Sequence, residues 1–141
     1  MPIAPAIIRE CRREDVPEVL RLWATSGASN TPTDTVEDVE RAVSEPGLEF
    51  LVAEADGHVV GTIMGGFDGW RGAISRLAVV ESHRRQGIGR ALLDEAMVRF
   101  ADNGVKVVSA LVEKDHPWAM AYWESTGFEL DERFVLFRHG M

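Results

Sequence analysis

The hydrophobic period of this chain changes near its middle, and that change most limits the folds open to it. Residues 50–55 and 58–64 follow the two-residue period of strands, and the Asp56-Gly57 pair between them is typical of a hairpin turn. A glycine-rich loop is expected over residues 65–72 and a third strand over residues 73–80. Antiparallel hairpins are therefore predicted at the centre of the chain.

Helices are predicted on both sides of these hairpins. The first helix ends at Gly27, and the second begins at Thr35, a residue type that caps helices, and stops before Pro46. The longest helix is expected over residues 87–103 and the last over residues 117–125, because apolar residues recur there at helical spacing.

Further strands are predicted at both ends of the chain. Residues 6–11 are expected to form the first strand, and residues 128–137 one or two strands at the end. Residues 105–112 are almost continuously apolar, which is typical of a central strand covered on both faces. The element order predicts an α+β fold, a single domain over residues 1–141 with a mixed, mostly antiparallel sheet and about four flanking helices.

The composition fits one globular domain and excludes several classes of function. The chain has 141 residues, of which 45 % are apolar and 27 % charged. Its 15 basic and 23 acidic residues give a net charge of −8, which argues against nucleic-acid binding, since that needs a basic face. We see no membrane span and no signal peptide, and the single cysteine, Cys11, indicates a reducing compartment, so a cytoplasmic protein is expected. The four histidines are scattered, and no metal site is expected.

The segment over residues 77–92 carries the strongest chemical signal. A predicted strand runs into a short loop that contains Arg84 and Arg85, and the loop opens the longest helix at Gly87 and Gly89. A helix start has unpaired N–H groups and a partial positive charge, and glycine lets a phosphate approach the backbone. A diphosphate site is the direct interpretation. The alternative is an ordinary helix start with a solvated pair of arginines.

Two motifs of this chain resemble the GNAT superfamily of N-acetyltransferases. Arg84-x-x-Gly87-x-Gly89 is similar to the acyl-CoA pyrophosphate loop of that family, and the run over residues 116–128 is similar to its downstream signature. Residues 50–72 also resemble a small bacterial subgroup related to the enzymes that acetylate protein N-termini. The resemblance implies that acetyl-CoA is the co-substrate. It also implies that a primary amine, on a small molecule, a protein N-terminus or a lysine, receives the acetyl group without a covalent enzyme intermediate.

The same resemblance implies where the cofactor lies. Two neighbouring parallel strands, over residues 74–80 and 105–113, are expected to splay apart and to hold the pantetheine arm between them. The backbone contacts to this arm are assigned to Leu77, Ala78 and Val79. The pyrophosphate contacts are assigned to Arg84, Arg85, Gln86, Gly87, Ile88, Gly89 and Arg90, and the remaining cofactor contacts to His116, Ala119 and Trp123. For His116, which precedes a proline, an ordinary helix start is the alternative.

Trp123 stands where the family usually has the tyrosine that acts as general acid, and three alternatives follow. In the first, Tyr122, the one tyrosine of the chain, protonates the leaving thiolate. In the second, Trp123 only lines the thioester pocket and water supplies the proton. In the third, the chain binds CoA and catalyses little.

The general base is assigned to Glu113. Leu111 occupies the position at which some relatives carry a glutamate, and Glu113 lies two residues further on, on the same face of the strand. Other carboxylates near strand ends are Asp68, Glu81 and Asp115, and a chain of ordered water or an acceptor amine of low pKa is the alternative to a base within the protein. Asp68 and Trp70, in the glycine-rich loop, are assigned to the acceptor site.

These features together predict an acetyl-CoA-dependent N-acetyltransferase. The alternative, from a different class, is a non-catalytic acyl-CoA-binding sensor or partner-binding module, which the replacements at Leu111 and Trp123 favour. A purely structural domain would bind no CoA. Neither nucleic acid nor membrane is expected as a partner, and the sequence is compatible with a homodimer.

Overall fold

The computed structural model describes residues 6–27, 30–116 and 118–141 of the chain. The chain divides into two compact units, Met1–Leu111 and Val112–Met141, which we call unit 1 and unit 2 and describe separately.

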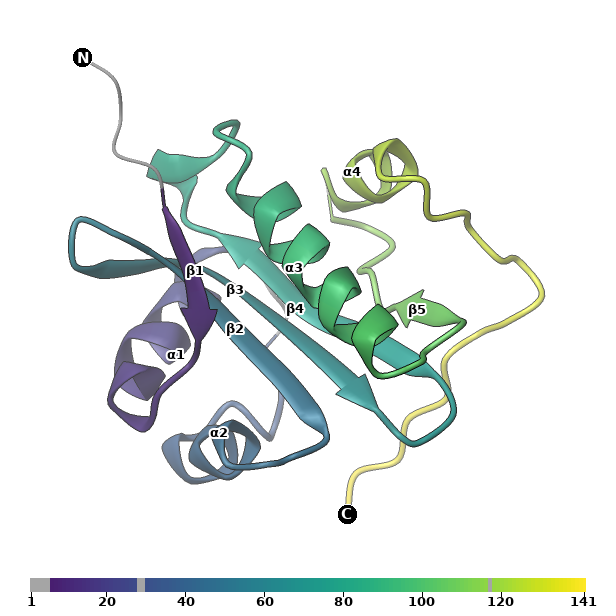
Figure 1. Cartoon of the computed structure of the whole chain (residues 1–141), viewed down its shortest axis with the longest axis horizontal. Helices are drawn as coiled ribbons and strands as arrows, with labels where there is room; N and C mark the ends of the chain where they lie inside the picture. Colours follow the sequence, from purple (N-terminus) through teal and green to yellow (C-terminus); the bar gives the residue numbers. More distant parts are fainter. Residues whose placement is uncertain (1–5, 28–29, 117) are drawn as a thin grey trace. The chain divides into compact units, whose positions relative to one another are not determined.

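Unit 1 is built on a five-stranded sheet in which the strands follow one another in chain order (Figure 1). Neighbouring strands are antiparallel except for the last pair, which is parallel. The strands are β1 (Ile7–Glu10), β2 (Leu48–Ala55), β3 (His58–Phe67), β4 (Gly72–Val79) and β5 (Val108–Ala110). This is the predicted mixed, mostly antiparallel α+β fold.

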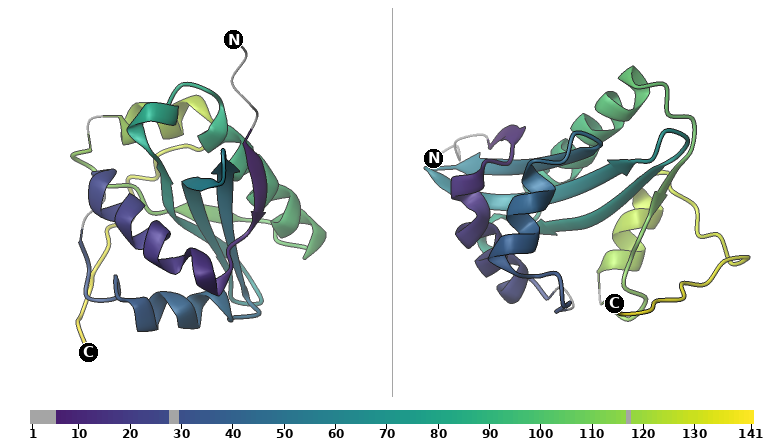
Figure 2. Two further views of the ribbon diagram at one scale, coloured as in Figure 1. Left: turned by 90° about the vertical axis from the view of Figure 1, so that its left-hand side faces the viewer. Right: turned by 90° about the horizontal axis from the view of Figure 1, so that it is seen from below.

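Helices cover both faces of this sheet. Helices α1 (Val16–Thr25) and α2 (Val36–Val43) lie on one face, and the longest helix, α3 (Ile88–Asp102), lies on the other (Figure 2). The helix bounds confirm the predictions, and so does the cap of α2, where the Thr35 side chain accepts a hydrogen bond from the backbone of Asp38. The sheet is thus enclosed between two helical layers, which exclude water from the apolar residues of its central strands.

The β2–β3 hairpin also forms as predicted. Asp56 and Gly57 both have positive φ angles, 52° and 78°, which is the backbone of a type I′ turn. This turn sets the register of β2 against β3, in which Ala55 lies opposite His58.

The predicted loop over residues 65–72 is wrong in its first part, because β3 continues to Phe67. Gly65 and Gly72 lie in neighbouring strands beneath the ring of Phe100, a fully buried residue of α3. A Cβ atom would come within 2.8 Å of this ring at Gly65 and within 3.0 Å at Gly72. The glycines therefore allow α3 to pack closely on the sheet, and they do not mark a loop.

The predicted strand over residues 105–112 is also too long, since β5 spans only Val108–Ala110. It pairs with β4 at three positions only, and the last of these joins Ile74 to Ala110. An apolar run continues as a strand only while a neighbouring strand supplies hydrogen-bond partners, and here the pairing ends early.

Unit 2 contains one helix, α4 (Ala119–Ser125), and the segment that follows it. The predicted strands over residues 128–137 are wrong, because these residues form none in the described structure. A strand needs a partner for its backbone, and the described residues of unit 2 include no strand. The segment leaves several large apolar side chains exposed, namely Leu130, Phe134, Val135, Leu136 and Phe137.

Candidate active site

One edge of β4 is open over most of its length. Pairing with β5 ends at Ile74, whose carbonyl still accepts a hydrogen bond of 3.0 Å from the backbone of Leu111. Beyond this point, residues 75–79 have no strand partner on that edge in the described part of unit 1. The backbone N–H and C=O groups that face this edge can pair with an extended ligand in the way a further strand would. Leu77, Ala78 and Val79, the residues assigned to the pantetheine arm, all lie in this stretch.

A β-bulge interrupts β4 at the start of the same stretch. Met64 lies opposite Ser75 and Thr62 lies opposite Ala78, so two residues of β4 face one residue of β3. Arg76, in the bulge, has a φ angle of +54°, in the left-handed region that residues other than glycine rarely adopt. The bulge therefore changes the direction of β4 next to its open edge.

The loop after β4 leads to the start of α3, where no side chain caps the helix. Gly87, at the N-cap of α3, has a φ angle of +81°, and Arg85 before it is also left-handed at +63°. The first hydrogen bond of the helix runs from Ala91 to Gly87, so the N–H groups of the first turn have no acceptor within the helix. There is no side-chain cap and no acidic residue in this turn.

The start of α2 is the useful contrast within the same protein. There Thr35 caps the helix, and Glu37 and Asp38 stand in the first turn, where they offset the positive end of the helix dipole. A chain with 23 acidic residues thus leaves the start of α3 without one. The arrangement suits an anionic ligand such as a diphosphate.

The three arginines of this region have different surroundings. Arg84 turns inward and donates hydrogen bonds to the carbonyls of Val79 (3.1 Å) and Ser26 (3.2 Å), so its side chain shapes the loop. Arg90 pairs with Asp94 at 2.9 Å on the helix surface. Arg85 is exposed. Arg85 and Arg90 are thus exposed beside the helix start, whereas Arg84 is partly buried.

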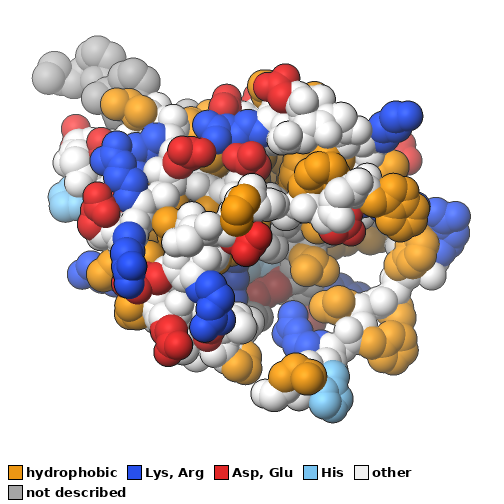
Figure 3. All heavy atoms as spheres, turned by 60° about the horizontal axis from the view of Figure 1, so that its bottom comes forward, with side chains coloured by type: hydrophobic (Ala, Val, Ile, Leu, Met, Phe, Trp, Pro, Cys, Tyr) orange, Lys and Arg blue, Asp and Glu red, His pale blue; other side chains and the backbone are white. Residues whose placement is uncertain are grey.

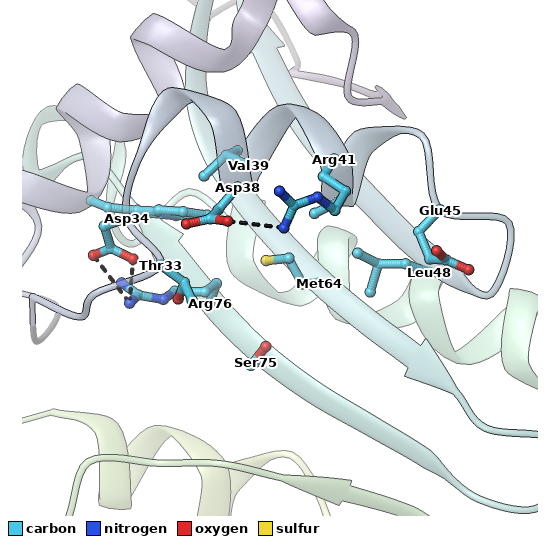
Figure 4. A pocket seen from close by; sticks show the side chains of 12 residues that line it. Thr33, Asp34, Asp38, Val39, Arg41, Glu45, Leu48, Met64, Ser75 and Arg76 are labelled. Atoms are coloured by element: carbon cyan, nitrogen blue, oxygen red, sulfur yellow. Dashed lines mark hydrogen bonds and ion pairs between the residues drawn. The ribbon is translucent and has the colours of Figure 1, made fainter. Parts of the chain in front are cut away.

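A pocket lies on the face of the sheet that α1 and α2 cover, between α2 and the strands. Its volume is about 450 Å³, and it is lined by Trp23, Thr33, Asp34, Asp38, Val39, Arg41, Ala42, Glu45, Leu48, Met64, Ser75 and Arg76. Figure 4 shows the Asp34–Arg76 pair at one end, Glu45 and Leu48 at the other, and Met64 between them. The pocket thus joins an apolar floor to charged ends, and it reaches the bulge of β4.

Asp68 and Trp70 lie in the β3–β4 turn and do not line this pocket. The carboxylate of Asp68 accepts the backbone N–H groups of Trp70 and Arg71, both at 2.8 Å, and these hydrogen bonds lower the pKa of Asp68. Trp70 is 71 % exposed, with the Arg71 guanidinium 4.1 Å from its ring centre. The structure therefore gives Asp68 a role in forming the turn and does not bring either residue to the pocket.

The remaining predicted residues belong to unit 2. Trp123 is buried on α4 and meets the ring of Phe128 edge-on at 4.9 Å, and Tyr122 beside it is half-buried. His116 precedes the helix, and its Nδ1 atom accepts the backbone N–H of Trp118 at 3.4 Å. Glu113 is exposed, and its carbonyl accepts the backbone N–H of His116. Ala119 is the first residue of α4. These residues form one short region of unit 2.

Cys11 does not offer a nucleophile. It is the one cysteine of the chain, it is buried, and burial raises the pKa of its thiol to about 12. Burial therefore favours the neutral thiol, which is a weaker nucleophile than the thiolate.

Sequence reasoning did not single out Arg76, which lines the pocket. The signal was present in the run Ile74-Ser75-Arg76-Leu77, where two polar residues in succession break the alternation of the strand. That break is typical of a bulge, and the prediction of an uninterrupted strand over residues 73–80 does not include it.

A parallel strand pair that ends after three positions, beside a glycine-containing helix start without a side-chain cap, is typical of one class of protein, the acetyl-CoA-dependent N-acetyltransferases. Residues 10–128 match the acetyltransferase (GNAT) family, and the chain belongs to it. This match includes the helix start of α3 and all five residues assigned in unit 2.

Three solved structures illustrate the likeness of fold. Ard1 from Thermoplasma volcanium is 28 % identical, with a TM-score of 0.81 over 91 % of this chain and 85 % of that one. PaiA N-acetyltransferase from Thermoplasma acidophilum, solved in complex with coenzyme A, is 18 % identical, with a TM-score of 0.82 over 92 % of each chain. An aminoglycoside 6′-N-acetyltransferase from Acinetobacter haemolyticus is 18 % identical, with a TM-score of 0.79 over 96 % of this chain and 99 % of that one.

The described residues show neither a membrane-spanning helix nor a cluster of metal ligands. None of their helices has the length and apolar character needed to cross a bilayer. Among the same residues, histidine, cysteine, aspartate and glutamate do not gather in any group of three that could hold a metal ion. Over the face of unit 1 that carries α1 and α2, basic and acidic side chains are interspersed (Figure 3). That face therefore shows no continuous basic patch.

Proposed function

We propose that this protein transfers the acetyl group of acetyl-CoA directly to a primary amine, on a small molecule, a protein N-terminus or a lysine. The observation that carries the proposal is the continuity of the open β4 edge with the uncapped start of α3. One part offers backbone hydrogen bonds to an extended amide chain, and the other offers positive charge to a diphosphate. Acetyl-CoA contains both groups in that order.

The cofactor contacts follow from this placement. The backbone of Leu77, Ala78 and Val79 pairs with the pantetheine amides, and the N–H groups from Arg85 to Arg90 surround the pyrophosphate. Arg85 adds a charged side chain, whereas Arg84 acts through the shape that it gives the loop. When bound, acetyl-CoA supplies the activated acyl thioester.

The acceptor amine enters through the pocket on the α2 side. This pocket is lined by Ser75 and Arg76, which directly precede the residues that we assign to the pantetheine arm. An amine at this end of the pocket therefore lies beside the bulge where the thioester is expected. The likeness to Ard1, at 28 % identity, supports testing peptides with free N-termini alongside small amines.

Proton transfer needs a base for the amine and an acid for the thiolate. Glu113 and Tyr122 remain our assignments for these roles. Water is the alternative in each case, since the tryptophan at position 123 has no acidic proton near neutral pH.

The buried Cys11 fits a cytoplasmic protein in a reducing compartment.

A second candidate is a non-catalytic acyl-CoA-binding module, which Trp123 at the usual tyrosine position favours. Titration calorimetry with acetyl-CoA, CoA and ATP distinguishes binding from its absence, and CoA release on adding amines or peptides distinguishes an enzyme from a module. Selective acetyl-CoA binding with CoA release supports the transferase. Binding with no release from any amine supports the module, and absence of binding refutes both.

A further inference from the structure

The bulge of β4 is held by side chains from three other segments of unit 1. Its residue Arg76 adopts a left-handed backbone that an arginine seldom takes. Such a conformation persists only where the surrounding structure determines it, and it is common at functional sites. The question is therefore what holds Arg76 in place, and what its position serves.

The backbone of the bulge is held by two hydrogen bonds in series, one buried and one partly buried. Thr62 of β3, which is fully buried, donates its hydroxyl proton to the carbonyl oxygen of Arg76 at 2.8 Å. The same hydroxyl oxygen accepts the indole N–H of Trp23 at 2.9 Å. Helix α1 is thereby connected through β3 to the bulge. The Thr62 hydroxyl acts as donor in one of these hydrogen bonds and as acceptor in the other.

The side chain of Arg76 is fastened from the opposite direction. Its guanidinium group contacts both carboxylate oxygens of Asp34, at 2.9 and 3.2 Å, and donates to the Thr31 hydroxyl at 3.3 Å. It also lies 4.8 Å from the ring centre of Trp23. The two partners of the ion pair are only 17 % and 13 % exposed, so water screens this pair weakly. Asp34 lies just before α2, in the wall of the pocket (Figure 4).

We propose that Thr62 and Asp34 are positioning residues, which hold the β4 bulge so that the thioester end of acetyl-CoA faces the pocket. This proposal rests on the proposed function. Thr62 sets the backbone direction of Leu77–Val79, which follow the bulge, and Asp34 attaches the pocket wall to the same bulge residue. The site for the acyl group and the wall of the acceptor pocket are therefore fastened to one residue, while the pyrophosphate is held outside the bulge, at the start of α3.

Hydrogen exchange with and without acetyl-CoA tests this separation. In the wild-type protein, acetyl-CoA is expected to slow amide exchange at two segments, residues 76–79 and residues 86–91. In Thr62→Val, which keeps the side-chain shape but loses the hydroxyl, protection of residues 76–79 falls about tenfold, the effect of losing one buried hydrogen bond. Protection of residues 86–91 stays within twofold. Thr62→Ser, which keeps the hydroxyl, restores protection of both segments.

Asp34→Asn has a matched control in the same unit. The Arg9–Asp15 pair is equally enclosed, at 16 % and 11 % exposure, and it joins β1 to the residue before α1. Asp34→Asn is expected to reduce protection of residues 76–79, and Asp15→Asn is expected to leave it unchanged, although both variants lose a partly buried ion pair.

The outcomes separate the two proposals. Equal protection of residues 76–79 in wild type and Thr62→Val overturns the positioning role, and so does an equal loss at both segments, which indicates general destabilisation. If acetyl-CoA protects neither segment of the wild-type protein, the proposed function itself fails, and this result appears before any variant is compared.

Discussion

The contact between Phe100 and the two glycines beneath it allows a quantitative prediction about how α3 is seated on the sheet. The Phe100 ring is 1 % exposed, and a Cβ atom at Gly65 would lie 2.8 Å from its Cζ atom and 3.2 Å from Cε2. Real Cβ contacts do not reach 2.8 Å, so in Gly65→Ala the ring and helix must move. A fully buried ring has no free space into which it can turn.

The expected loss of stability follows from two opposed effects. Inserting a methyl group into a packed core costs about 1–3 kcal/mol. Replacing glycine by alanine returns about 0.4–1 kcal/mol, because the unfolded chain loses freedom. We therefore expect Gly65→Ala to lower the free energy of unfolding by about 1–2 kcal/mol, and the melting temperature by roughly 3–8 °C for a chain of this size.

Urea denaturation followed by circular dichroism measures this difference, and the neighbouring glycine provides the control. A Cβ atom at Gly66 would meet only the Leu48 Cδ1 atom, at an ordinary 3.9 Å, so Gly66→Ala keeps the gain from the unfolded chain and should raise the free energy of unfolding by about 0.4–1 kcal/mol. Phe100→Leu in the Gly65→Ala background should recover part of the loss, as a coupling energy in a double-mutant cycle. If Gly65→Ala and Gly66→Ala are equally stable, the close contact between Phe100 and Gly65 does not exclude a Cβ atom at position 65, and the reasoning is refuted.

Three further predictions concern the site and its support. Gly89→Glu puts a carboxylate into the first turn of α3 and should abolish acetyl-CoA binding in calorimetry, since the carboxylate repels the pyrophosphate. Unchanged affinity would refute the assignment of the pyrophosphate site to this helix start. Tyr122→Phe should lower turnover at least tenfold with acetyl-CoA affinity within twofold, and wild-type turnover would assign the proton to water. The hydrogen bond from Arg9 lowers the pKa of Asp15, so this group stabilises the fold above its unfolded pKa, and that stability is lost as pH falls through the lower, folded pKa. Asp15→Asn should therefore flatten the fall in unfolding free energy below about pH 4, and parallel curves for the two proteins would contradict this.

Local signals in the sequence predict most of the fold of unit 1. The cap at Thr35 and the turn at Asp56-Gly57 depend on neighbouring residues only, and both form as expected. The start of α3 at Gly87 is equally local, because glycine permits the positive φ angle of the N-cap. Such features need no knowledge of the rest of the chain.

The errors come from interactions between distant segments. Gly65 is predicted to lie in a loop, and only its contact with Phe100 of α3 explains a glycine within a strand. The length of β5 depends on where its pairing with β4 ends. Residues 128–137 have the apolar pattern of strands, yet a pattern supplies no hydrogen-bond partner, and these residues form no strand in the described structure. In each case the deciding contact lies far away in the sequence.

Arg76 combines both kinds of information. Two adjacent polar residues in a strand indicate a bulge, but they do not show why the bulge carries an arginine where glycine fits the backbone better. The structure supplies the reason, since only a long cationic side chain reaches Asp34 while its own carbonyl is held by Thr62. Glycine would relieve the backbone and lose the attachment to the pocket wall. The unfavourable residue at this position is therefore explained by what it connects, the backbone of the β4 bulge and the wall of the pocket, and acetyltransferase motifs do not indicate that connection.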